Sequence, residues 1–255
     1  MKRIYFTLLG LLFFTGNLFA QYARFPTVGV IEFEKKINMH ALIKKSINKD
    51  NESYMNQAFE QYKKNQPQFK TLKSTLSFTK DKSLFIPIES QESPSFYSGH
   101  PAVTQINTVY NDLSANASII QKKVFEETFL VRDTTRSINW KITNEMRDIA
   151  GFSCRRANAV IMDSIYVVAF YTDEIPVSSG PETFSGLPGM ILGVALPHEN
   201  ITWFATSVTD KPLAKPLVSP AKGKLTDNKG LRKILESSLK QYGEYLSMAL
   251  KIYLL

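Results

Sequence analysis

Few residues of this chain have the types and spacing that catalysis requires. Cys154 is the single cysteine, and a thiolate nucleophile needs a base beside it. The three histidines, His40, His100 and His198, are scattered along the chain and lie outside any cysteine-protease pattern. Because Cys154 lies in an alternating strand pattern, we expect a buried and unreactive thiol, with a reactive thiol as the alternative.

The sequence gives equally little support for a metal site or for a serine nucleophile. Asp173 and Glu174 follow a predicted strand and could join a distant histidine in a weak metal site, although the histidines have no metal-binding spacing. Ser185 lacks the Gly-x-Ser-x-Gly elbow of serine hydrolases. The sequence therefore predicts no catalytic residue, no metal ligand and no cofactor-binding residue. It favours a non-enzyme and leaves enzymatic activity open.

The most informative stretch is a stiff apolar loop at residues 173–189. It holds three prolines, three glycines and the apolar residues Ile175 and Val177, and it exceeds the usual length of structureless loops. We expect it to close the core as a rigid plug, with a ligand-binding or partner-binding surface as the alternative. Its motif residues, structural or partner-facing, are Gly180, Pro181, Phe184, Gly186, Leu187, Pro188 and Gly189.

The loop ends in a proline-glycine corner. Pro188 can preset the second position of a type II turn, and Gly189 can supply the positive φ of its third position. The apolar run at 190–196 then predicts a buried strand.

Short segments rich in β-branched and aromatic residues recur along the chain. They predict strands at 28–39, 69–78, 84–86, 104–113, 117–125, 128–131, 139–143, 154–161, 165–171, 190–196 and 201–208. Few helices separate them, which indicates an antiparallel and curved sheet. We therefore expect a mainly β fold of the α+β class, in a single domain that spans 21–255.

Two helices are expected to pack on this sheet. A three-and-four spacing of apolar residues predicts a short helix at 51–64, and a longer stripe that includes Leu231, Leu235 and Leu239 predicts one helix at 229–254. A coiled-coil or membrane-surface helix is the alternative for the second. Residues 89–101 have the composition of a flexible loop.

The first 20 residues have the three-part pattern of a secretory signal peptide. Lys2 and Arg3 precede an apolar run at 4–14, which is too short to span a bilayer comfortably, and Ala20 is a suitable cleavage site. We expect cleavage near Ala20, a periplasmic or secreted protein, and no transmembrane span in the mature chain. A retained N-terminal anchor or a buried first helix is the alternative.

The mature chain is mildly basic. It holds 29 basic and 23 acidic residues, and its lysines come as scattered pairs such as Lys35 with Lys36 and Lys122 with Lys123. No sustained basic helix accompanies them, so we expect these pairs on a solvated surface and expect no nucleic-acid partner.

Three segments resemble the GLPGLI family, secreted proteins of Bacteroidetes. They are Ile-Ala-Gly-Phe-Ser-Cys-Arg-Arg-Ala at 149–157, Ala-Phe-Tyr-Thr-Asp-Glu-Ile-Pro-Val-Ser-Ser-Gly-Pro at 169–181 and Phe-Ser-Gly-Leu-Pro-Gly-Met-Ile-Leu at 184–192. The family's hexapeptide stands at 186–191, with Met190 in place of its second leucine. The resemblance is specific over about 142–192 and vague over the N-terminal third. It implies an exported envelope protein of unestablished activity, often encoded near TonB-dependent outer-membrane receptors.

Two hypotheses follow. The preferred one is a non-catalytic binding or accessory protein whose partner is an envelope protein, such as a TonB-dependent receptor, or a hydrophobic ligand held in an apolar concavity. The other is a hydrolase or a metal-handling protein whose site is assembled only by folding. A purely apolar pocket favours the first hypothesis, and converging charged residues with shifted pKa values favour the second.

Overall fold

A computed structural model describes residues 25–89, 97 and 99–255 of the chain. The predicted signal peptide and most of the predicted flexible loop at 89–101 lie outside these residues. The strands are β1 (Gly29–Asn38), β2 (Phe69–Phe78), β3 (Lys82–Pro87), β4 (Asn107–Asp112), β5 (Ala117–Val124), β6 (Glu127–Thr134), β7 (Lys141–Ile149), β8 (Phe152–Ile161), β9 (Ile165–Thr172), β10 (Met190–Leu196), β11 (Ile201–Thr209) and β12 (Lys224–Thr226). The helices are α2 (Met39–Ser46), α3 (Glu52–Asn65), α4 (Pro101–Thr104), α5 (Asn228–Leu239) and α6 (Glu244–Tyr253), with 3-10 turns at Pro197–Glu199 and Lys240–Tyr242.

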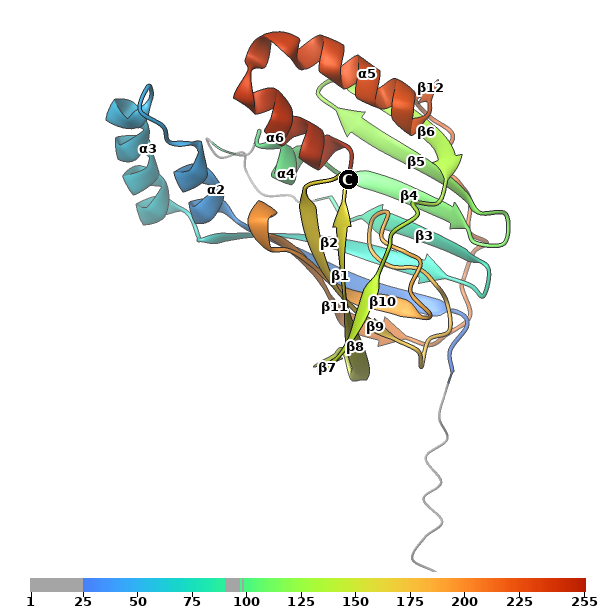
Figure 1. Cartoon of the computed structure of the whole chain (residues 1–255). Coiled ribbons are helices and arrows are strands. Elements are labelled where there is room, and N and C mark those ends of the chain that lie inside the picture. Colours follow the sequence, from blue (N-terminus) through green and yellow to red (C-terminus); the bar gives the residue numbers. More distant parts are fainter. Residues whose placement is uncertain (1–24, 90–96, 98) are drawn as a thin grey trace, which may run out of the picture.

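All twelve strands form one sheet. Their order is β12-β6-β5-β4-β3-β2-β1-β11-β10-β9-β8-β7, and every neighbouring pair is antiparallel except β12 with β6. The sheet curves strongly around a concave side (Figure 1). The predicted mainly β fold with a curved antiparallel sheet is confirmed.

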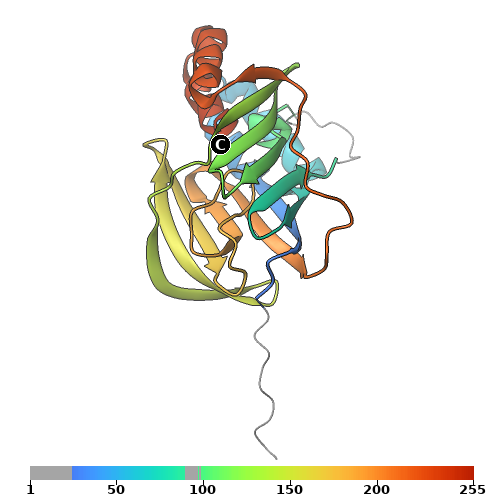
Figure 2. The same ribbon diagram turned by 90° about the vertical axis from the view of Figure 1, so that its right-hand side faces the viewer.

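The concave side holds the core. Along β1, Ile31, Phe33, Lys35 and Ile37 point inward, because successive residues of a strand face opposite sides of the sheet. The connection at 173–189, which we call the plug loop, runs between β9 and β10 and lies inside the curve (Figure 2). The plug loop therefore fills the concave side of the sheet.

The helices gather at one end of the sheet (Figure 1). The strand pattern predicted for 28–39 ends at Asn38, whose side-chain Oδ1 accepts a hydrogen bond of 3.1 Å from the Ala41 amide and caps α2. Helix α2 is missing from the sequence prediction, whereas the helix predicted at 51–64 agrees with α3. The strand predicted at 104–113 is shorter, because α4 occupies its beginning.

The predicted single helix at 229–254 is wrong. Gly243 has φ 52° and ψ −122°, a conformation that only glycine adopts easily, and it separates α5 from α6. Helix α5 still buries the predicted stripe of Leu231, Leu235 and Leu239, and it lies beside β6 (Figure 1). The break lets α6 turn back, so that its C-terminal end enters the concave side. No helix in the described part of the chain is long and apolar enough to cross a membrane.

Candidate functional site: a buried charged cluster beneath the plug loop

The plug loop packs its apolar residues into the core. Ile175, Val177, Phe184 and Leu187 are each at most 2% exposed, and the Phe184 ring lies 6.0 Å from that of Trp203 on β11. Of the seven predicted motif residues, only Gly186 and Pro188 are exposed. The loop is therefore buried in the core, and its rigidity stays a prediction.

The three glycines of the plug loop are required for two different structural reasons. A Cβ atom at Gly180 would lie 2.7 Å from the Ile191 Cβ, and one at Gly189 would lie 2.1 Å from the Thr172 carbonyl oxygen. Gly186 instead has a positive φ of 92°, and a Cβ atom there would make only an ordinary contact of 3.6 Å with Trp140 Nε1. Close approach therefore requires glycine at 180 and 189, and backbone conformation favours it at 186.

The type II turn predicted at the proline-glycine corner is corrected. The Gly189 amide donates to the Leu187 carbonyl at 2.8 Å, and the Met190 amide donates to Ile175 at 3.0 Å instead of closing the expected turn. Gly189 has φ 159°, which is close to extended. The corner is thus a three-residue turn centred on Pro188.

A buried carboxylate lies within the plug loop. Glu182 is 5% exposed, and its Oε2 accepts a hydrogen bond of 2.8 Å from the Asn107 side chain on β4. Asn107 Oδ1 accepts in turn from the Gln105 side chain, and Lys35 Nζ donates to the Gln105 carbonyl at 3.4 Å. Lys35 and Glu182 also attract each other. These four residues close a ring of interactions between the loop and the sheet.

Two further cations extend this cluster to the end of α6. Lys122 Nζ on β5 donates to the Tyr253 carbonyl at 2.6 Å, and Arg136 Nη2 donates to the Leu254 carbonyl at 2.6 Å. Arg136 Nε also donates to Thr183 Oγ1 of the plug loop at 3.2 Å. Cations suit the negative end of a helix, so the cluster holds α6 and the plug loop together.

Burial shifts the pKa values of this cluster. It lowers the pKa of Lys35 and raises that of Glu182, and the attraction between the two opposes both shifts. The pKa of Lys122 falls to about 7, mainly through burial and with repulsion from Arg136 and Lys35, while Glu182 raises it. A buried charge is costly unless it is paired, which is why the Glu182 carboxylate stabilises the lysines.

Lys35 and Lys122 overturn the prediction that the lysine pairs lie on a solvated surface. Each is the first member of its pair and points inward, while Lys36 and Lys123 point outward. Glu182 was missed altogether, because this acid lies among apolar residues of the loop and belongs to no recognisable acid-containing motif. The sequence signal for the cluster was that each lysine lies on the apolar face of a strand with alternating polarity, Lys35 on β1 and Lys122 on β5.

The residues that the sequence singled out for chemistry do not converge. Cys154 is fully buried, and burial together with Glu174 and Asp148 raises the pKa of its thiol to about 12. Glu174 accepts from the Ser153 amide at 3.3 Å, and Asp173 is exposed. Across residues 25–89, 97 and 99–255, no three His, Cys, Asp or Glu side chains gather as metal ligands.

The three histidines stand in separate structural places. His40 lies on α2, and its ring centroid is 5.9 Å from that of Phe59. The ring centroid of His198 is 6.5 Å from that of Tyr166. His100 Nδ1 accepts from the Ala102 amide at 3.1 Å and caps α4, and burial lowers the pKa of His100 to about 4. His100 is therefore a neutral capping residue at physiological pH.

Residues 159–193 match a family described as a protein of unknown function (Porph_ging). The matched stretch runs from the last three residues of β8 through β9 and the plug loop into β10, and it contains the hexapeptide at 186–191. The match is compatible with the GLPGLI resemblance, and membership of that family stays a prediction. The search of curated proteins returned no match.

Solved structures of PNGF-II share the fold. Its P21 crystal form has a TM-score of 0.51 and 15% identity, with 82% of this chain and 33% of that chain covered. Its C2 form has a TM-score of 0.50 and 13% identity, with 78% and 31% covered. The chain thus spans about a third of PNGF-II, and at this identity the likeness concerns the fold alone.

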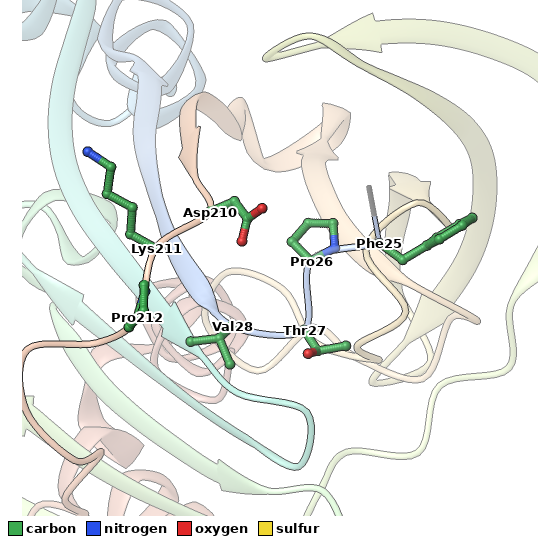
Figure 3. A pocket seen from close by; sticks show the side chains of 7 residues that line it. All are labelled: Phe25, Pro26, Thr27, Val28, Asp210, Lys211 and Pro212. Carbon is green, nitrogen blue, oxygen red and sulfur yellow. The ribbon is translucent and has the colours of Figure 1, made fainter. Parts of the chain in front are cut away.

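A hollow of about 250 Å³ borders the charged cluster, where Arg136 and Leu254 line it, and larger hollows lie farther from Glu182. One, of about 330 Å³, forms where residues 25–28 run beside residues 210–212, and Figure 3 shows Phe25 and Lys211 pointing away from each other at its two ends. Another, of about 340 Å³, lies on the outer face, where the Arg147 guanidinium is 4.7 Å from the Phe204 ring centroid. By contrast, the cavity beside Lys35 and Glu182 measures about 20 Å³.

Proposed function

We propose that this chain is an exported envelope protein with a non-catalytic binding or accessory role, and that it binds a partner protein through its outer surface. The observation that carries this proposal is the burial of the plug loop in the concave side. Ligand pockets usually measure about 300–1,000 Å³, whereas the cavity left beside Glu182 measures about 20 Å³. A hydrophobic ligand of ordinary size does not fit there.

Export is proposed from the N-terminal sequence. Lys2 and Arg3, the apolar run at 4–14 and the small residue Ala20 match the pattern of a cleaved leader. Cleavage near Ala20 would deliver a mature chain beginning at Gln21 to the periplasm or the medium. The partner class that we favour, a TonB-dependent outer-membrane receptor, comes from the GLPGLI resemblance.

The likeness to PNGF-II concerns the fold and is compatible with an accessory role. There the fold covers about a third of a larger chain, so the same architecture can serve as one part of a bigger assembly. A likeness at 15% identity does not carry the activity of the larger protein with it.

One observation favours the enzyme hypothesis. Lys35 and Glu182 converge with shifted pKa values, which is common at catalytic sites. Structural ion pairs shift pKa values as well, and here the cluster joins the plug loop, β4 and the end of α6. A substrate would have to displace the plug loop to reach these groups, so we assign the cluster a structural role.

The test is affinity purification from the envelope of the native host. An affinity tag in the exposed linker near Lys215 avoids the buried Leu254 and Leu255. We expect the recovered chain to begin at Gln21 and to carry one partner protein at constant stoichiometry, both in the wild type and in a Glu182→Gln variant that remains folded. One metal ion or one small molecule per chain, without a protein partner, would overturn the binding role. An uncleaved leader would overturn the proposed export.

A further inference from the structure

A small cavity adjoins the charged cluster. Its volume is about 20 Å³, and its lining includes Lys35, Ser74, Glu182 and Trp203. These residues come from β1, β2, the plug loop and β11, so the cavity lies where the loop meets three strands. Apolar side chains, among them Leu72 and Phe85, form most of the rest of its lining, and a cavity of this size holds about one water molecule where polar groups face it.

Two polar groups at this cavity have no partner in the described part of the protein. Ser74 Oγ and Trp203 Nε1 are both fully buried, and neither makes a protein hydrogen bond. The Trp203 indole lies close enough to Glu182 to stabilise its carboxylate, but without regular hydrogen-bond geometry. Native proteins rarely leave such groups unpaired, because each lost hydrogen bond to water is uncompensated.

Two charged groups complete the surroundings. Lys35 Nζ lies 5.3 Å from the centroid of the Trp203 ring and has three N–H groups, one of which faces the Gln105 carbonyl at 3.4 Å. The Glu182 carboxylate uses Oε2 to accept from Asn107, which leaves further acceptor capacity. The cavity therefore brings together two donors, one acceptor and one hydroxyl that can do either.

We propose that a single ordered water molecule binds in this cavity and joins the plug loop to the sheet. It accepts hydrogen bonds from Trp203 Nε1 and Lys35 Nζ and donates to the Glu182 carboxylate and Ser74 Oγ. Two accepted and two donated bonds use the full capacity of one water. A chloride ion fits less well because the Glu182 carboxylate would repel it, and a metal cation would face the Lys35 ammonium and the indole N–H.

The test uses the two tryptophans of the chain as probe and control. Trp203 Nε1 points at the proposed water, whereas Trp140 Nε1 donates to the Ser185 carbonyl at 2.9 Å. In the purified ¹⁵N-labelled protein, we expect the Trp203 indole proton to show NOE and ROE cross-peaks of opposite sign at the water frequency, as a long-lived water produces. The Trp140 indole proton should lack this signature, and Trp203→Phe assigns the signal.

Two variants of β2 sharpen the test. Ser74→Val fills the cavity with a methyl group and should abolish the Trp203 cross-peak, whereas Ser77→Val, on the opposite face of the same strand, should keep it. Absence of the cross-peak in folded wild-type protein, or its persistence in Ser74→Val, would overturn the proposal. Should Ser74→Val fail to fold, a crystal soaked in bromide decides: a water peak within hydrogen-bond distance of Trp203 Nε1 supports the proposal, and an anomalous bromide peak there overturns it.

Discussion

The Asn107 side chain donates a hydrogen bond of 2.8 Å to Glu182 Oε2, and this contact joins β4 to the plug loop inside the curved sheet. The Glu182 carboxylate attracts the ammonium groups of both Lys35 and Lys122. The plug loop therefore supplies the counter-charge for two lysines that belong to the sheet. Its place in the fold depends on charge as well as on apolar packing.

The electrostatic attraction between Lys35 and Glu182 should be important for stability. Lys35→Met leaves Glu182 buried without its first partner, and we expect this to lower the free energy of unfolding by about 3 kcal/mol. Lys36→Met removes the exposed neighbour and should change it by at most about 0.5 kcal/mol. Urea unfolding followed by tryptophan fluorescence measures both variants, and equal effects would contradict the inward placement of Lys35.

A double variant tests whether the two charges act as a unit. Glu182→Gln keeps the size of the side chain and removes its charge, so it should rescue part of the loss in Lys35→Met. We expect a coupling free energy of about 1–3 kcal/mol between the two sites. Strict additivity of the two single variants would show that the lysine and the carboxylate do not interact.

Lys122 should make stability depend on pH. Its pKa is about 7 in the folded protein against an ordinary value of 10.5, so between these values the unfolded chain binds more protons. The free energy of unfolding should therefore rise with pH, by about 2 kcal/mol from pH 7 to pH 9 for this residue. The penalty for the buried charge is fully present below pH 7 and is relieved above it.

Lys122→Met and Lys123→Met form a matched pair for this prediction. The first should flatten the rise in the free energy of unfolding between pH 7 and pH 9, although Lys35, whose pKa burial also lowers, leaves some slope. The second removes an exposed lysine and should leave the slope unchanged. An unchanged slope in Lys122→Met would mean that another group controls this range.

The close approach of the backbone at Gly189 predicts that a side chain costs more stability there than at Gly186. Gly189→Ala places a Cβ atom against the Thr172 carbonyl, and we expect a loss of about 3 kcal/mol from this overpacking. Gly186→Ala makes only an ordinary contact with Trp140 and has an unfavourable φ, which should cost about 1 kcal/mol. Thermal or urea unfolding separates the two, and a larger loss in Gly186→Ala would contradict the close approach at Gly189.

The period-two patterns predicted the sheet, and the length and stiffness of residues 173–189 predicted the plug. The charged cluster was not predicted, because Lys35, Lys122 and Glu182 lie far apart in the sequence and only the place of the two lysines on apolar strand faces pointed to it. Lysine on an apolar strand face is normally solvated, and only the partner across the fold reverses that expectation. The break at Gly243 was equally hidden, since one glycine inside a helical pattern is often tolerated.

Cys154 provides the last prediction, because its burial should suppress its chemistry. With a pKa of about 12, the fraction of thiolate at pH 8 is about 10⁻⁴, and the Sγ atom lies against the Phe152 carbonyl at 3.5 Å. We expect no reaction with a disulfide reagent in the folded protein and rapid, stoichiometric reaction in denaturant. Ser153→Cys in a Cys154→Ala background places a thiol on the exposed face of the same strand and should react without denaturant. Fast labelling of the folded wild type would show that Cys154 is accessible and would return the reactive-thiol alternative to consideration.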